Sequence, residues 1–199
     1  MEEKYFRIEL ITEMLGTVPK DPDIYKTYIE SKKPEEITDE EYLSVEKIEE
    51  KVWTGFHSDE NGLFIYDYMI RGFLKNAGNV LKESLKLKSV KSKIDQFVFV
   101  FPRKIYLGKT EPDGDLKRSL RVMGPSGPRV CIAKSDLVNA GTILDFYIKI
   151  VPNKDIDMET IDHIMEYGQL CGIGQFRNGS YGRFVVQQIE GHTGTKHAA

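Results

Sequence analysis

The sequence predicts an α+β fold, in which an antiparallel sheet carries two helices on one of its faces. Segments rich in β-branched and aromatic residues lie near both ends of the chain, and two amphipathic segments with helical spacing lie between them. Without its insertions, the order of elements is strand, helix, strand, strand, helix, strand. With 199 residues, of which 40% are hydrophobic and 30% charged, the chain suits one globular domain. We expect this domain to span residues 1–190 and residues 191–199 to form a flexible tail.

The first part of the chain is expected to begin with a strand and to continue into an acidic helical insertion. The strand is predicted over Tyr5–Thr12 from its β-branched and aromatic content. The insertion spans about residues 21–51 and has the pattern of two helices. The second of these begins at a capping box, Thr38-Asp39-Glu40-Glu41.

A hairpin and a long helix follow the insertion. Asn61-Gly62 lies between two apolar runs and predicts a tight hairpin turn. The apolar residues from Met69 to Leu81 keep helical spacing, so a helix is predicted over about residues 67–87.

The second half of the chain supplies the remaining elements. They are a largely apolar strand over 95–108, a hairpin of 117–123 and 129–134, a strand over 141–151, a short helix over 157–168 and a final strand over 182–190. The complete order predicts a ferredoxin-like, RRM-like sheet with two helices, extra β-hairpins and the acidic helical insertion. The open face of such a sheet commonly binds nucleic acid in RNA-recognition modules.

The charge distribution points to an anionic partner. Residues 71–134 carry 15 Lys and Arg against 5 Asp and Glu, whereas residues 1–70 carry 8 against 18, and the total is only −3. Basic blocks attract nucleic acid because binding releases condensed counterions. The alternative is that acidic and basic parts neutralise each other within the fold or between subunits, which leaves self-association open.

The sequence predicts a cytoplasmic protein without a membrane partner. No apolar run approaches the roughly 18 residues of a membrane helix, and the N-terminus has no features of a signal peptide. Cys131 and Cys171 stand in no metal-ligand spacing and are predicted to be reduced thiols. We expect neither a metal nor a cofactor.

The stretch YGQLCGIGQFRNGSYGRF, residues 167–184, joins the second helix to the final strand. It does not fit the dinucleotide fingerprint, which would need glycine at Arg177, nor the P-loop, whose lysine and hydroxyl are replaced by Ser180-Tyr181. What remains is a loop whose backbone can approach another chain closely. The structural alternative is a helix C-cap followed by a bulged turn.

Three segments connect this loop to a known family. GIGQFRNGSYGRF resembles the C-terminal glycine-rich loop of the RAMP superfamily, the RNA-binding backbone and processing subunits of CRISPR effector complexes. IYDYMIRGFLKNAGNVL resembles the first helix of that superfamily, and GPRVCIAKSDLVNAGTILDFYIKIV is similar to its middle hairpin. The ending is also similar to that of compact phage or mobile-element proteins.

The resemblance covers just over half of the chain and implies a RAMP-like domain that binds RNA. Lys75 matches the lysine of the first helix, and the matching loop glycines are Gly172, Gly174, Gly179 and Gly182. The chain departs from the family at residues 67–72, where backbone subunits have a serine-rich stretch. No aspartate of a cleavage loop can be matched, so a slicing activity is not implied.

The predicted nucleic-acid contacts are basic residues of the middle third and of the glycine loop, with two aromatic residues of that loop. They are Lys75, Arg103, Lys104, Arg118, Arg121, Arg129, Lys134, Arg177, Arg183, Phe176 and Tyr181. The basic side chains would contact phosphates, which sets affinity and not sequence preference, and the aromatic rings would stack on bases.

An enzyme is the less favoured interpretation. RNA-processing members of the superfamily often use histidine as a general acid or base, and here the one candidate is His57. An exposed hairpin histidine is nevertheless the expectation for His57, and a solvated residue is the expectation for His163. We therefore predict a non-enzymatic protein that binds RNA or single-stranded DNA.

Three alternatives remain open from the sequence. One is a phage- or mobile-element-encoded interaction protein that inhibits a host defence complex, for example one of the CRISPR type. Another is a binder of small phosphorylated ligands at the glycine loop. The last is a metal-independent endoribonuclease that acts through His57.

Overall fold

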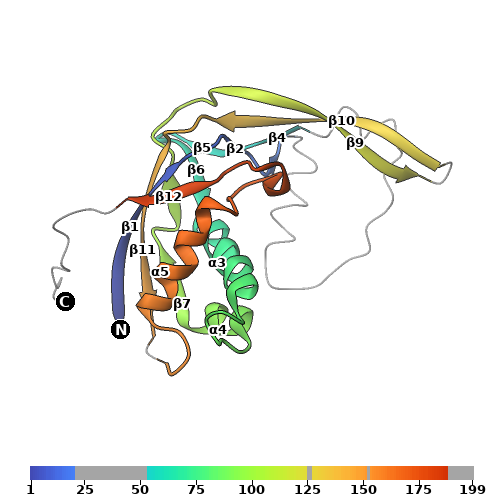
Figure 1. Ribbon diagram of the computed structural model, residues 1–199. Helices are drawn as coiled ribbons and strands as arrows, with labels where there is room; N and C mark the ends of the chain where they lie inside the picture. The colour runs from blue at the N-terminus through green and yellow to red at the C-terminus, as the bar shows by residue number, and fades with distance from the viewer. Residues whose placement is uncertain (21–52, 125–126, 152, 188–199) are drawn as a thin grey trace, which may run out of the picture.

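The fold is an antiparallel sheet with helices on one face and long hairpins at one end. The computed structural model describes residues 1–20, 53–124, 127–151 and 153–187 (Figure 1). The expected helical insertion over 21–51 and the expected tail over 191–199 lie outside the described residues.

The central sheet has the strand order β12-β1-β11-β7, and all neighbours are antiparallel. Its strands are β1 (Glu2–Leu10), β7 (Val98–Phe101), β11 (Ile143–Ile150) and β12 (Phe184–Gln187). The two crossover helices are α3 (Asp67–Leu81) and α5 (Met158–Glu166). The predicted ferredoxin-like α+β fold is therefore confirmed.

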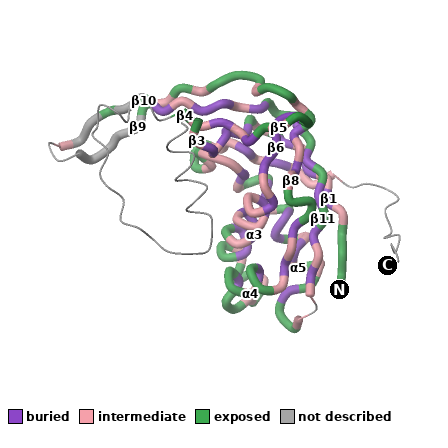
Figure 2. The backbone as a smooth tube through the Cα atoms, turned by 180° about the vertical axis from the view of Figure 1, so that it is seen from behind, coloured by how far each residue is buried: buried purple, intermediate pink, exposed green. Residues whose placement is uncertain are grey.

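Alternation along each strand decides which side chains face the helices. Phe6, Ile8 and Leu10 are buried toward α3 and α5, whereas the residues between them lie on the open face. Phe73 of α3 meets Phe184 of β12 edge to face, with ring centroids 5.0 Å apart. Full burial of one such side chain stabilises the fold by about 1.5–3 kcal/mol, and Figure 2 shows the buried residues concentrated between the sheet and the helices.

The predicted strand over 95–108 is wrong in its first part. Residues Val90–Phe97 form the helix α4, which precedes β7, and a separate strand β8 covers Lys104–Tyr106. Val90 and Ile94, one helical turn apart, bury the inner side of α4, but two residues give too short a pattern to stand out beside the apolar run that follows. The described residues thus contain three α-helices, one more than the two predicted for this part of the chain.

Two other predicted boundaries also differ. The first strand ends at Leu10 and not at Thr12. The long helix ends at Leu81 and not near residue 87, because the chain then enters a turn in which Lys86 adopts the left-handed region, with φ of 54°.

Both predicted hairpins are present. Asn61-Gly62 turns between β5 (His57–Asp59) and β6 (Gly62–Tyr66), and φ of Gly62 is 109°, which favours glycine. The second hairpin consists of the long strands β9 (Gly114–Gly124) and β10 (Gly127–Val138). It crosses one end of the central sheet, and its tip projects beyond the body of the molecule (Figure 1).

Short strands close the base of the second hairpin. β10 pairs with β2 (Met14–Leu15) and in parallel with β4 (Trp53–Gly55), which pairs with β3 (Val18–Pro19). The base thus combines segments far apart in the sequence. Among the described residues, no helix is long and apolar enough to cross a membrane.

Candidate nucleic-acid interface

The glycine loop lies against the base of the β9–β10 hairpin. Gln175 forms an isolated bridge with Leu15 of β2, and Gly182 donates a backbone hydrogen bond to Glu13 over 2.7 Å. These contacts fix both arms of the loop on the chain that leads into the hairpin base.

The four predicted loop glycines make close contacts within the chain itself. At Gly182, φ is 71° and an added Cβ would lie 1.8 Å from the carbonyl oxygen of Ile173. Gly172 packs on the backbone of residues 181–182, and Gly174 packs on the Leu15 carbonyl. Gly179 packs on the Phe176 ring. The predicted close approach is therefore made to the chain's own atoms, and these glycines shape the loop.

The loop presents two aromatic rings in a stack. Phe176 has φ of 56° and keeps 44% of its surface exposed. Its ring centroid lies 5.7 Å from that of Tyr181 at an interplanar angle of 29°. The guanidinium carbon of Arg118, on β9, lies 5.0 Å from the Phe176 centroid. A cation and two rings thus lie side by side, in an arrangement suited to stacking on bases.

Arg118 has no carboxylate partner among the described residues. One Nη2 proton is donated to Oε1 of Gln175 over 2.8 Å, while Nε and Nη1 are buried without a hydrogen-bond partner there. The same Oε1 accepts bonds from Ser135 and Thr54, over 2.7 and 3.0 Å. Burial lowers the pKa of Arg118, but a guanidinium stays charged at neutral pH. Among the described residues, its positive charge therefore contacts neutral groups only.

A second cation–aromatic cluster lies on the other face of the hairpin. The Trp53 ring lies between Lys20 and Lys134, whose Nζ atoms are 4.1 and 3.6 Å from its centroid. Nε1 of Trp53 donates to buried Asp136 over 2.7 Å, which fixes the ring, and 38% of the residue remains exposed. Lys134 also faces Asp115 at 3.6 Å. We call Arg118, Phe176, Tyr181, Trp53 and Lys134 the hairpin-base cluster.

Other predicted basic residues are engaged elsewhere in the fold. Lys75 pairs with Asp95 at 2.9 Å, Arg103 with Asp67 at 2.9 Å, and Lys104 with Asp59 at 2.5 Å. These three predicted contacts are not brought together with the hairpin-base cluster.

The remaining predicted basic residues lie in the loop or on the hairpin. Arg183 donates to the Ser180 hydroxyl over 2.8 Å. Arg177 is half-buried beside Phe176 and has no ion pair within the described part of the chain. Arg121 and Arg129 pair through the backbone with Val130 and Val122, and their side chains lie outside the described residues.

Sequence reasoning missed Trp53, Lys20 and Gln175. Trp53 joins the cluster because β4 pairs in parallel with β10, which brings it opposite Lys134. No local pattern reveals a pairing over this separation in sequence. The one available signal is that Trp53, the first residue of a short strand, is the chain's only tryptophan.

His57 is not the exposed hairpin histidine expected from the sequence. Only 5% of it is exposed, and its ring stacks on Phe64 with centroids 5.4 Å apart and meets Tyr66 edge-on. The prediction failed because His57 packs against the Phe64 and Tyr66 rings of the neighbouring strand β6. Burial lowers the pKa of His57.

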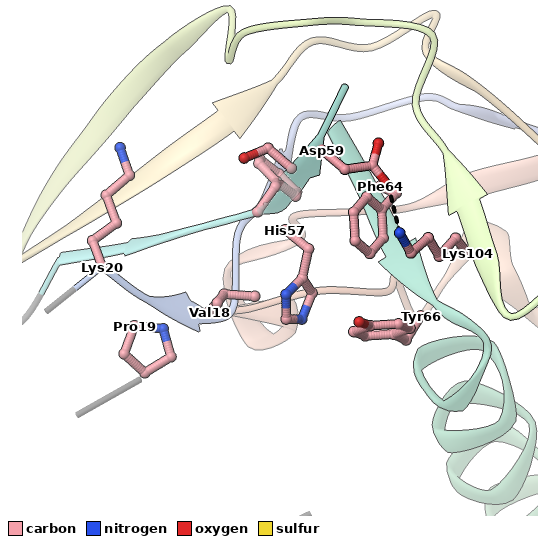
Figure 3. Close-up of a pocket in the computed structure, with 10 residues that line it drawn as sticks. Val18, Pro19, Lys20, His57, Asp59, Phe64, Tyr66 and Lys104 are labelled. Atoms are coloured by element: carbon pink, nitrogen blue, oxygen red, sulfur yellow. Dashed lines mark hydrogen bonds and ion pairs between the residues drawn. The ribbon is translucent and has the colours of Figure 1, made fainter. Parts of the chain in front are cut away.

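The side chain of His57 lines a cleft of about 570 Å³, together with Val18, Lys20, Tyr66 and Lys104 (Figure 3). His163 is 52% exposed in its side chain, as expected. Within the described residues, no group of three or more His, Cys, Asp or Glu side chains could hold a metal ion.

No protein-family model matches the chain, and no curated protein matches it. Among solved structures, the chain is similar to one chain of the Type III-B Cmr-beta complex bound to cognate target RNA, with 13% identity and a TM-score of 0.47. That match covers 94% of this chain, which spans 60% of the other chain's length.

A chain of a Type IV-B CRISPR complex is similar at 11% identity and a TM-score of 0.48, covering 100% of this chain and 94% of the other. The structural neighbours are thus chains of CRISPR complexes, and membership of the RAMP superfamily stays a prediction.

Proposed function

We propose that this protein binds RNA or single-stranded DNA at the hairpin-base cluster and does not cut it. The observation that carries the proposal is the Arg118–Phe176–Tyr181 stack, in which a guanidinium without a carboxylate partner among the described residues lies over the Phe176 ring, which stacks on Tyr181. Single-stranded nucleic acid offers the two complementary features, a negative backbone and flat bases with exposed faces.

Four members of the cluster have a defined task in this proposal. Phe176 and Trp53, both partly exposed, stack on bases, which is worth about 1–3 kcal/mol per base. Arg118 and Lys134 supply the field that attracts phosphates. Contacts of this kind set affinity and leave sequence preference low.

The basic residues around the cluster extend this footprint. Lys117 is exposed and lies opposite Lys134 in the hairpin register. Arg121 and Arg129 continue the same two strands, and Arg177 and Arg183 lie in the glycine loop. Lys117 shares the face of Lys134, and the glycine loop lies on the face of Arg118, so this footprint covers both faces of the hairpin base.

The absence of cleavage is part of the proposal and rests on the candidate base. His57 is buried against Phe64 and Tyr66 and carries a lowered pKa, and it does not belong to the hairpin-base cluster. A general base must come within hydrogen-bond reach of the proton that it removes. A strand stacked on Phe176 would not present its 2′-hydroxyl to this buried ring.

A protein partner is the second candidate, supported by the outer face of the same hairpin. Val130 and Ile132 of β10 are both 61% exposed and lie on the face of the hairpin that carries Lys134. Exposed apolar residues on a projecting strand pair suit docking on another protein. This would place the chain in a larger complex, such as a defence complex of the CRISPR type.

The experiment is a fluorescence-anisotropy titration of labelled RNA and DNA of about 30 nucleotides, at about 50 and 200 mM salt. Wild type should bind tightly and lose affinity steeply with salt, and gel analysis should show intact RNA. Phe176→Ala should weaken binding, whereas Lys154→Gln should not, because Lys154 is an exposed lysine outside the cluster that has no ion pair with any described residue. Absence of binding at low salt would overturn the proposal.

A further inference from the structure

A second basic surface lies in the turn between α3 and α4. Residues 82–91 contain four lysines, and Glu83 is their only acidic residue. Each of these four lysines is exposed, and none forms an ion pair within the described part of the chain. They are Lys82, Lys86, Lys88 and Lys91, which we call the lysine turn.

The backbone of the turn holds a lysine where glycine would fit better. The amide of Leu87 donates to the Lys82 carbonyl over 2.8 Å, and that of Lys86 donates to the Glu83 carbonyl over 3.2 Å. This pair of bonds is a Schellman motif, in which Lys86 occupies the left-handed position usually taken by glycine. The chain therefore keeps a charged side chain at a position where it strains the backbone.

The lysine turn and the hairpin base lie at opposite ends of the molecule. Figure 1 shows α4 at the end of the sheet farthest from the β9–β10 hairpin. Figure 2 shows exposed residues around α4. The basic middle third of the sequence thus folds into two separate surfaces, whereas its residues Lys75, Arg103 and Lys104 pair with Asp95, Asp67 and Asp59.

We propose that the lysine turn is a second contact for the phosphate backbone of a bound nucleic acid, a proposal that rests on the function proposed above. The lysine side chain is a compact point charge that suits phosphate. The turn exposes no aromatic residue, and Leu85 and Leu87 pack against the core. It can therefore attract a backbone but cannot stack on bases.

The composition of the turn favours nucleic acid over a protein partner. Protein–protein interfaces are depleted of lysine and are built around aromatic or apolar residues that become buried. The exposed side chains of the turn are lysines, serines and one glutamate. A polyanion that contacts four unpaired ammonium groups fits this surface better.

The first test compares a strand of about 8 nucleotides with one of about 40, on wild type and on a variant with all four lysines changed to Gln. The short strand can occupy the hairpin base alone, so its affinity should not change. The long strand can reach both surfaces. Because each phosphate contact adds about 0.7 to the salt slope of a single strand, its slope should fall by about 2–3. A Lys154→Gln control should leave both strands unchanged.

A second pair of variants separates charge from backbone strain. Lys86→Gly relieves the left-handed position and should raise the midpoint of thermal unfolding while it weakens long-strand binding. Lys86→Gln should weaken binding to the same extent without that rise. This pair keeps the test informative even if the fourfold variant folds poorly.

The outcomes distinguish this inference from the function on which it rests. If wild type binds both strands and the long-strand slope is unchanged in the fourfold variant, the lysine turn is not a nucleic-acid contact and a protein with an acidic surface becomes its expected partner. If wild type binds neither strand, the proposed function itself fails and this inference fails with it.

Discussion

The open face of the central sheet and the hairpin-base cluster both combine aromatic rings with arginine, but they differ in how the charge is compensated. On the open face, Phe101, Tyr147 and Tyr5 lie opposite one another across β7, β11 and β1. Arg7 beside them makes two hydrogen bonds to Asp145, over 2.7 and 2.9 Å. At the hairpin base, Arg118 has a glutamine partner and no carboxylate among the described residues.

The lysine of the open face is also paired more closely than Lys134 of the hairpin base, which lies 3.6 Å from Asp115. Lys149 pairs with Glu3 at 2.8 Å and lies 5.5 Å from the Phe101 centroid. A phosphate that approached this face would have to displace carboxylates from both of its cations. Aromatic content alone therefore does not identify a nucleic-acid surface. The two surfaces differ in that Arg118 has no carboxylate partner among the described residues.

The largest expected effect is the loss of nucleic-acid affinity on removal of the exposed ring at the hairpin base. Removal of a ring on the open face serves as the comparison. Phe176→Ala should weaken binding of single-stranded nucleic acid by about 1–3 kcal/mol, which is about 5- to 150-fold, because a stacked base loses its partner. Tyr147→Ala, on the open face, should change affinity by less than about 0.5 kcal/mol. Anisotropy titrations of both variants against the same strand make the comparison, and the reverse ranking would move the site to the sheet.

A smaller effect is expected from removing one arginine on each surface. Arg118→Gln should lower the salt slope of binding by about 0.7 and weaken affinity, whereas Arg7→Gln should leave both unchanged. Arg118→Lys should restore most of the slope, since it keeps the charge. Thermal melts of the three variants control for folding. If Arg118→Gln and Arg7→Gln change the salt slope and the affinity equally, carboxylate pairing does not distinguish the two surfaces.

A gain of binding is expected when the open face loses its carboxylate. Asp145→Asn removes the partner that neutralises Arg7, so this face should acquire a weak affinity for phosphates. The slope for a long strand should rise by at most about 0.7. The double variant Arg7→Gln/Asp145→Asn should return to the wild-type slope. If the double variant keeps the raised salt slope, Arg7 is not the source of the added phosphate binding.

The smallest effect concerns stability at acidic pH. The hydrogen bonds from Arg7 lower the pKa of Asp145, against the smaller opposing effect of its burial. Since the folded pKa lies below the unfolded one, the pair stabilises the fold above about pH 4, and this contribution is lost as the pH falls through the lowered folded value. The side chain is 42% exposed, so water screens the pair.

Urea unfolding at about pH 3 and pH 6 checks this expectation. The free energy of unfolding should fall slightly more on acidification in wild type than in Asp145→Asn. The same fall in both proteins would show that the pair contributes nothing measurable. In either case, the result reports on the open face and leaves the hairpin base untouched.

Much of the fold could be predicted because its signals are local. The order of strands and helices follows from the spacing of apolar residues. The Asn61-Gly62 turn is predicted because these two residue types readily adopt the positive φ angles of a tight hairpin turn. The helix α4 was missed because only Val90 and Ile94 bury its inner side. The expected insertion over 21–51 and the single-domain boundary at residue 190 stay predictions.

The site could be predicted only in part because its contacts are long-range. Phe176 and Tyr181 were singled out by a glycine-rich segment that proves to hold them in a stack. Trp53 was missed, since it reaches Lys134 through a strand pairing that no local pattern reveals. The sequence predicts Lys104 as a nucleic-acid contact, because it does not reveal that the partner Asp59 lies two strands away in the sheet β5-β6-β8.

The most direct measurement uses Trp53, the only tryptophan of the chain, as a reporter inside the proposed site. Its fluorescence can be recorded while an unlabelled strand of about 30 nucleotides is added. A base stacked on the ring should quench the emission in a saturable way, with the same dissociation constant as anisotropy gives. If anisotropy shows tight binding that Phe176→Ala does not weaken, while the Trp53 emission also stays unchanged, the nucleic acid lies elsewhere and the assignment to the hairpin base is wrong.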